Sequence, residues 1–226
     1  MKKTILIILV AAFAITMQAQ DNQKSQEIKT IFGSPNGKIT SGGYGAITVN
    51  YSKIDGKDAV LVGGRGGWII NHHFVLGLAG MGFASDLSYE SNTNYNSDDY
   101  FLTGGYGGLL LETILMPFSA VNISIPVTIG AGGAAYVKTD YYSGYEDYYN
   151  YPYDNYNSAF FVLEPGIEVN LNVVKFMRVT FGGYYRYTSG LNLMEPVNGF
   201  EKDGVKVDGD ILNGFSGGLT LKFGKF

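Results

Sequence analysis

The sequence contains eight segments in which apolar and polar residues alternate, the pattern of a β-strand with one apolar face and one polar face. In the first segment, Ile47, Val49 and Tyr51 fall on one face, whereas Thr48 and Asn50 fall on the other. Glycine recurs within these segments, 32 times in the whole chain, and each glycine disfavours a helix by about 1 kcal/mol relative to alanine. The pattern predicts an all-β chain, with strands near 42–53, 59–70, 74–85, 100–113, 122–137, 159–171, 176–188 and a last strand that ends the chain.

The connections between these segments alternate between short and long. A hairpin turn is expected at Asp55-Gly56, short turns at 71–73 and 172–174, a medium connection around 116–119, and long connections at 86–99, 140–157 and 189–213. A membrane barrel sorts its connections in this way, with the long loops outside the cell. We therefore predict an eight-stranded antiparallel transmembrane up-and-down β-barrel over residues 39–226. The alternative is a secreted sandwich or a lipocalin-like barrel, which also has alternating strands and glycine-rich turns.

Aromatic residues fall near both ends of the expected strands. At the long-loop ends they are Tyr51, Phe83, Phe101, Tyr136, Phe160 and Tyr187, and at the other ends Trp68, Phe74, Phe118, Phe176 and Phe226. Two girdles of aromatic side chains are typical of a barrel that crosses two membrane interfaces. The aromatic positions therefore favour the membrane barrel.

The first 20 residues have the features of a secretory signal peptide. Lys2 and Lys3 precede an apolar run at 5–15, and Ala19 lies in a small-residue cleavage region. We predict that residues 1–20 are removed on export, that residues 21–38 form a polar periplasmic leader, and that the protein resides in the outer membrane. Removing Lys2 and Lys3 changes the formal charge from -4 to -6, which argues against nucleic acid as a partner. The chain has no cysteine for a disulfide or a lipid anchor.

The residues from Leu219 to Phe226 resemble the closing strand of many Gram-negative outer-membrane barrels. In those proteins the barrel insertion machinery reads a terminal aromatic, so the resemblance implies an insertion signal at Phe223 and Phe226 and implies this machinery and outer-membrane lipid as partners. Residues 104–112 and 129–133 resemble an uncharacterised family of small outer-membrane barrels, similar in architecture to the eight-stranded barrels of the outer-membrane protein A and X type. One departure is that Leu219, Leu221 and Phe223 alternate out of phase with Phe226.

Seven charged residues share the face of the strands that we expect to line the lumen: Arg65, Glu112, Glu164, Glu168, Arg178, Arg186 and Lys222. The interior of an eight-stranded barrel is just wide enough for side chains to fill it. Buried ions without partners cost several kcal/mol each, so these groups are expected to pair with one another as a plug. Glu168 and Arg178 would lie opposite each other across a three-residue turn at 172–174. The alternative is a narrow pore lined by the same charges.

The connection at 140–157 is rich in tyrosine and acidic residues and contains no basic residue. Its tyrosines are Tyr141, Tyr142, Tyr145, Tyr148, Tyr149, Tyr151, Tyr153 and Tyr156. Tyrosine-rich loops supply a large, rigid contact area at a low entropy cost. The segment is therefore a candidate surface that would recognise a glycan or a protein, and the alternative is a solvated loop that shields the barrel mouth.

The two histidines, His72 and His73, fall in a short turn expected to face the periplasm. A Ser-His hydrolase acting on outer-membrane lipid needs its histidine near the outer leaflet and a nucleophile within hydrogen-bond reach. We therefore predict a non-enzymatic barrel, without cofactor or metal, whose role is structural or surface interaction. A narrow pore or carrier for small solutes is the second hypothesis, and a lipid-modifying enzyme is a distant third.

Overall fold

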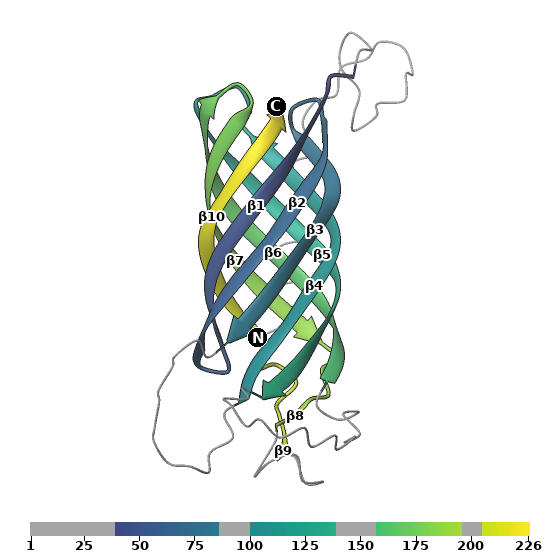
Figure 1. Ribbon diagram of the computed structural model, residues 1–226. Helices are drawn as coiled ribbons and strands as arrows, with labels where there is room; N and C mark the ends of the chain where they lie inside the picture. The colour runs from purple at the N-terminus through teal and green to yellow at the C-terminus, as the bar shows by residue number, and fades with distance from the viewer. Residues whose placement is uncertain (1–38, 86–99, 139–156, 196–204) are drawn as a thin grey trace, which may run out of the picture. The chain divides into compact units, whose positions relative to one another are not determined.

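The computed structural model describes residues 39–85, 100–138, 157–195 and 205–226, and within them eight long strands close into one antiparallel barrel (Figure 1). The predicted eight-stranded antiparallel architecture is confirmed. In the described ranges no helix is long and apolar enough to cross a membrane. The expected signal peptide at 1–20 and the leader at 21–38 lie outside the described residues.

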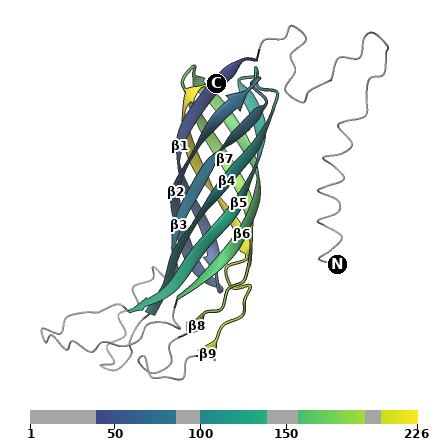
Figure 2. The ribbon, with the colours of Figure 1, turned by 90° about the vertical axis from the view of Figure 1, so that its right-hand side faces the viewer.

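Each barrel strand pairs with its neighbours in sequence, and the first strand pairs with the last. A two-stranded sheet, β8 with β9, lies in the connection between β7 and β10 (Figures 1 and 2). The strands are β1 (Ser41–Ile54), β2 (Lys57–Ile70), β3 (Phe74–Ser85), β4 (Tyr100–Leu115), β5 (Val121–Lys138), β6 (Asn157–Val174), β7 (Met177–Ser189), β8 (Met194–Glu195), β9 (Val205–Lys206) and β10 (Gly214–Lys225).

The barrel has two unlike ends. At the end that we call the short-turn end, turns at 71–73, 116–120 and 175–176 join consecutive strands, and β10 finishes. At the long-loop end, Asp55-Gly56 forms a tight turn, with both residues at positive φ as a two-residue hairpin requires. The other connections at this end are 86–99, 139–156 and 190–213, so the loops are sorted by length as expected.

The turn predicted at 172–174 is wrong. Strand β6 continues to Val174, and the turn is the pair Lys175-Phe176. The strand continues because the neighbouring β4–β5 turn extends the pairing: the backbone N–H of Asn172 donates to the carbonyl of Ala120. A register shift between Asn172 and Val174 then absorbs the extra residues before β7 begins.

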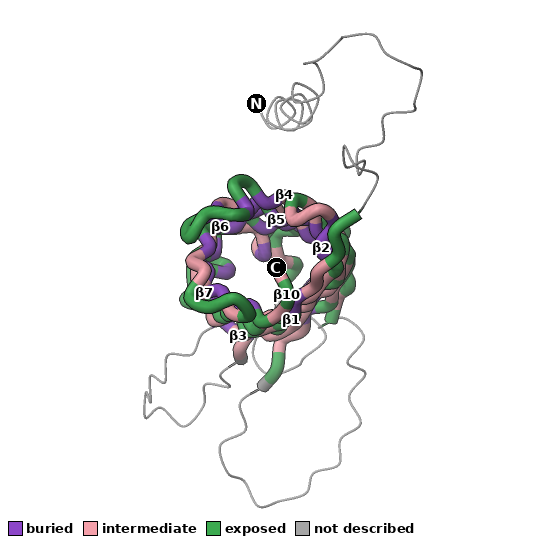
Figure 3. Tube along the Cα trace, turned by 90° about the horizontal axis from the view of Figure 1, so that it is seen from above, coloured by how far each residue is buried: buried purple, intermediate pink, exposed green. Residues whose placement is uncertain are grey.

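Side chains on the barrel strands alternate between an apolar outer face and a largely buried inner face. Ile47, Leu78 and Ile167 are more than 60% exposed on the outer face, whereas inward neighbours such as Thr48 and Glu168 are buried. Viewed from above, the strands form a closed ring in which buried and exposed residues both occur along the wall (Figure 3). Charged residues mark both ends of the outer face: Lys53 and Asp58 at the long-loop end, and Lys225 at the short-turn end. Between these two ends, no described outward position carries a charged residue.

Several inward glycines are required because the strands and their neighbours approach closely. A Cβ atom added to Gly130 would lie 2.0 Å from the carbonyl oxygen of Gly107, and one added to Gly108 would lie 2.1 Å from the carbonyl oxygen of Ile129. These contacts are with backbone atoms, which cannot move aside without breaking the β4–β5 pairing. The glycine content thus reflects the tight curvature of a small barrel.

Not all of the aromatic residues at strand ends belong to girdles. Tyr51, Trp68, Phe118, Phe176 and Tyr187 are exposed on the outer side or in the short turns. In contrast, Phe83 and Phe160 are buried inside the barrel, and the ring of Phe226 packs against the interior residue Tyr44. Tyr136 also has the inward phase of its strand and packs against the buried interior cluster. For these four residues the girdle prediction is wrong, because each has the inward phase.

Candidate functional site

The centre of the barrel contains four mutually paired charges, which we call the charge quartet: Arg65, Glu112, Glu168 and Lys222. The Nζ atom of Lys222 lies 2.7 Å from Oε1 of Glu112 and 2.9 Å from Oε2 of Glu168. The guanidinium of Arg65 forms an ion pair with the other oxygen of Glu168. These four side chains come from β2, β4, β6 and β10, and all are buried. The quartet therefore braces strands that are not neighbours in the wall.

Neutral groups satisfy the remaining acceptor positions of the two quartet carboxylates. The hydroxyl of Tyr44 donates to Glu112. Glu168 accepts from Tyr184 at 2.6 Å and from Ser124 at 2.8 Å, and Ser124 in turn accepts from the side-chain amide of Asn170. Because both carboxylates are paired and hydrogen-bonded, the quartet meets the condition under which buried charges are tolerated.

Glu164 and Arg186 lie nearer the long-loop end and are also buried. The hydroxyl of Tyr106 donates to Glu164 at 2.5 Å. The guanidinium of Arg186 lies 5.8 Å from the ring centres of both Phe83 and Tyr106, and its Nε donates to the backbone carbonyl of Leu212 at 2.7 Å. Its Nη1 and Nη2 atoms have no hydrogen-bond partner in the described part of the chain.

Arg178 does not pair with Glu168, so that expected contact is wrong. The β6–β7 register places Asn172 opposite Arg178 and Gly182 opposite Glu168. The reason is that β6 runs on to Val174 and the turn comes later in the chain, which moves β7 along β6 relative to the predicted pairing. The guanidinium of Arg178 instead lies 3.8 Å from the centre of the Phe226 ring, a cation–π contact at the short-turn end.

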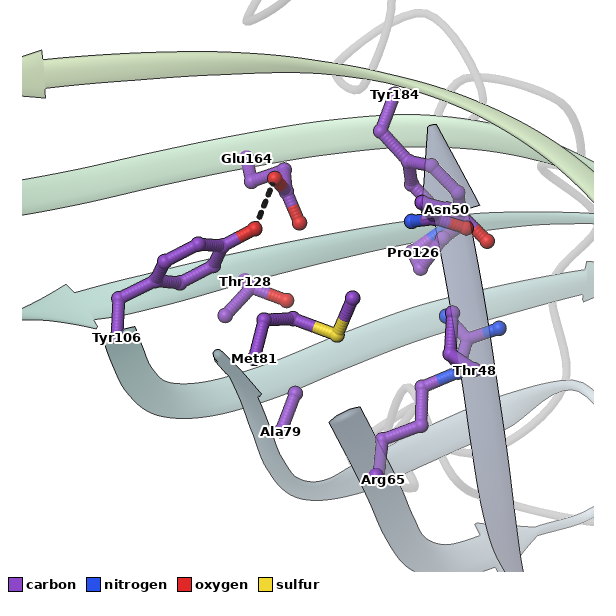
Figure 4. Close-up of a pocket in the computed structure, with 11 residues that line it drawn as sticks. Thr48, Asn50, Arg65, Ala79, Met81, Tyr106, Pro126, Thr128, Glu164 and Tyr184 are labelled. Carbon is purple, nitrogen blue, oxygen red and sulfur yellow. Dashed lines mark hydrogen bonds between the residues drawn. The ribbon is translucent and has the colours of Figure 1, made fainter. Parts of the chain in front are cut away.

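Between the quartet and Glu164 the interior leaves a cavity of about 20 Å³. Figure 4 shows its lining, in which the hydroxyl of Tyr106 on β4 donates to Glu164 on β6, with Met81 and Thr128 nearby. A volume of roughly 10–15 Å³ on this scale holds a single water molecule. The cavity is therefore too small to hold a hydrated ion or a solute.

An apolar layer fills the long-loop end of the lumen. Its wall, which we call the apolar cup, consists of buried residues from β1 to β6: Ile54, Ala59, Leu61, Phe83, Leu102, Tyr106, Ala134, Phe160 and Val162. Three buried leucines of the β7–β10 connection, Leu191, Leu193 and Leu212, pack into the same cluster, and we call them the plug. The described parts of the connection predicted as a long loop at 189–213, residues 189–195 and 205–213, thus place these three leucines in the barrel mouth.

Hydrogen bonds hold the plug segment to the wall at several points. Besides the Arg186–Leu212 bond, the side chain of Asn213 accepts from the backbone N–H of Thr188 at 2.6 Å and from its hydroxyl at 2.9 Å. Burying each leucine contributes about 1.5–3 kcal/mol relative to leaving it exposed. The plug is thus an integral part of the folded interior.

A second apolar layer lies at the short-turn end. Tyr44, Ile69, Val75 and Ile114 form a buried cluster, and Phe226 packs against it. The lumen therefore consists of three layers in series: this apolar layer, the charged and polar centre, and the plugged cup.

The two residues expected to form an insertion signal face opposite sides of the wall. Phe223 points outward and is 43% exposed, whereas Phe226 is turned inward against Tyr44 and Arg178. The tyrosine-rich segment that contains Tyr141 to Tyr156 lies outside the described residues.

The plug is the part of the interior that sequence reasoning missed. Its signal was present: Leu191 and Leu193 alternate with polar residues, and Ile211-Leu212 interrupts an otherwise polar stretch. Apolar residues at these positions have no reason to lie in a solvated loop. The alternation alone does not show that these leucines fill the lumen. That placement depends on β7 and β10 being adjacent and on the position of the leucines at the barrel mouth.

No protein-family model matches the chain, and no curated protein sequence matches it. Among solved structures, the outer membrane protein OprG from Pseudomonas aeruginosa is similar, with 12% sequence identity and a TM-score of 0.40. The matched region covers 82% of this chain and 94% of the OprG chain. The barrel described above follows from the strand pairing of this chain alone.

Proposed function

We propose that the chain is an integral outer-membrane β-barrel with a closed lumen and a structural or surface-interaction role. The observation that carries the proposal is the charge quartet. Lys222 joins Glu112 and Glu168 across the barrel, Arg65 completes the pairing, and apolar layers lie on both sides. A pore needs a continuous polar path, so this packing favours a braced barrel over the narrow-pore alternative.

The outer face supports a location in a membrane. The barrel strands contain 12 to 18 residues each, more than the roughly 9–11 residues that a tilted strand needs to span the hydrocarbon layer. Their outward side chains are apolar, and the described outward positions between the terminal charges carry no ionised group. A soluble barrel would expose this belt to water, whereas outer-membrane lipid would cover it.

Features at the two ends of the barrel support a non-enzymatic role at the cell surface. His72 packs against Phe118, and Nδ1 of His73 lies 3.1 Å from the carbonyl oxygen of Ile114. These contacts involve no side-chain nucleophile of the described residues. At the other end the tyrosine-rich segment 141–156 would supply contact area for a surface glycan or protein. Outer-membrane lipid and the barrel insertion machinery are the further partners proposed.

Expression in a Gram-negative host followed by membrane fractionation tests the location. The protein should appear in the outer-membrane fraction without residues 1–20, and recovery from the soluble periplasm would contradict the proposal. Proteoliposomes test the closed lumen. Vesicles that contain the folded barrel should swell in small sugars no faster than empty vesicles, and fast, protein-dependent swelling would favour the pore.

A further inference from the structure

We propose that the apolar cup is a binding site for an amphipathic anion, a hydrocarbon chain with a carboxylate or similar head group, and that the plug occupies this site in the resting protein. The inference goes beyond the proposed function, since it concerns only the outer mouth and leaves the charge quartet closed.

The wall of the cup has the chemistry of a hydrocarbon site. Interiors of membrane barrels are ordinarily polar. Here six consecutive strands, β1 to β6, point buried apolar side chains into the long-loop end. The leucines that fill the cup belong to a connection and not to the wall. The cup is therefore an apolar concavity closed by a separate segment.

The base of the cup carries a charged group with free donors. Arg186 is fully buried, and both of its terminal nitrogens lack hydrogen-bond partners among the described residues. Glu164 lies near enough to attract Arg186 electrostatically, but it forms no salt bridge with it among the described residues and accepts a hydrogen bond from Tyr106. A guanidinium binds a carboxylate through two parallel charge-assisted hydrogen bonds, so an anionic head group would satisfy the donors that the protein leaves unused.

A ligand that enters the cup has to break the few hydrogen bonds that hold the plug to the wall. The β8–β9 sheet of the same connection contains only two residue pairs, and Arg186 itself holds the plug through Nε and the carbonyl of Leu212. A hydrocarbon chain that replaced Leu191, Leu193 and Leu212 would restore the apolar burial that displacement removes. A ligand displaces the plug only if it binds the open cup more tightly than it binds the plugged cup.

Equilibrium dialysis of radiolabelled octanoate and octanol tests this site, with the folded protein in lipid nanodiscs and empty nanodiscs as the blank. We expect saturable binding of both compounds, with octanoate bound about tenfold more tightly because its head group is charged. The R186Q variant should abolish the preference for octanoate, whereas R186K should keep part of it. A preference that survives R186Q would overturn the assignment of Arg186.

Variants of the plug test self-occupation of the cup. L193A and L212A weaken the packing of the plug, so each should tighten the binding of both compounds by about tenfold or more. The matched control is L219A, which removes the same atoms from a leucine on the outer face and should leave binding unchanged. Absence of saturable binding in both the native protein and the L193A variant would overturn the proposal, as would equal tightening by L219A.

Discussion

The ammonium group of Lys222 on β10 lies 2.9 Å from the carboxylate of Glu168 on β6, although β7 separates these two strands in the wall. The contact therefore skips one strand through the interior, and the second contact of Lys222, with Glu112 on β4, reaches the opposite wall. Hydrogen bonds between neighbouring strands hold the wall together, whereas this ion pair fixes the cross-section of the barrel. Removing this ion pair should therefore change both the stability of the barrel and the closure of its lumen.

Replacing Glu168 with alanine should destabilise the folded barrel by about 3–5 kcal/mol, because Arg65 and Lys222 would both lose a buried partner. Urea unfolding in lipid vesicles, followed by the shift between folded and unfolded gel bands, measures the change. The control is Asp208→Ala, which removes an exposed carboxylate and should change stability by less than about 0.5 kcal/mol. Equal stability of the two variants would contradict the brace.

Two glycines of β5 should respond differently to alanine. In Gly130→Ala the new methyl group would lie 2.0 Å from the carbonyl oxygen of Gly107, so the variant should fold poorly or unfold at much lower urea. In Gly133→Ala the nearest atom would be 3.8 Å away, so folding should be retained. The yield of heat-modifiable folded protein compares them, and normal folding of Gly130→Ala would show that the strands do not approach this closely.

Trp68 should report the membrane interface at the short-turn end. It is the single tryptophan of the chain, lies on the outer face, and donates through Nε1 to the hydroxyl of Ser41 at 2.6 Å. Tryptophan favours the interfacial region of a bilayer. Its fluorescence in vesicles should therefore be quenched more by lipids brominated near the head group than by lipids brominated near the chain ends. Efficient quenching by aqueous iodide alone would argue against a lipid-facing position.

Deletion of residues 141–156 should leave insertion and folding intact. The paired wall is formed by β5 and β6 on either side of this segment, and the quartet, cup and plug contain none of its residues. Outer-membrane content and the heat-modifiable band are the measurements. Failure of the deletion variant to insert would make the segment structural and would remove it as a candidate recognition surface.

The sequence predicted the wall of the barrel well because each strand has a period of two. Ile47 and Thr48 are consecutive residues of a strand, so their side chains point to opposite faces whichever strand pairs with it. The same reasoning explains why Arg65, Glu112, Glu168 and Lys222 were assigned to one interior. Alternation gives the face of a residue without knowledge of the register.

The pairing inside the barrel was not predictable in the same way. The contact of Glu168 with Lys222 depends on the stagger of three strands, and a change at the β6–β7 turn was enough to separate Glu168 from Arg178. The position of Leu193 depends on a connection that folds back across the mouth, which a period-two pattern does not describe. The register between strands and the position of a connection inside the lumen therefore could not be predicted from the sequence pattern.

Single-channel current in a planar bilayer tests the central claim of a closed lumen most directly. The refolded protein, with insertion verified by its heat-modifiable band, should give no reproducible conductance steps, because two apolar layers and the charge quartet lie in series across the lumen. Steady steps of uniform size from the native protein would contradict the account and would make the interior charges the lining of a pore.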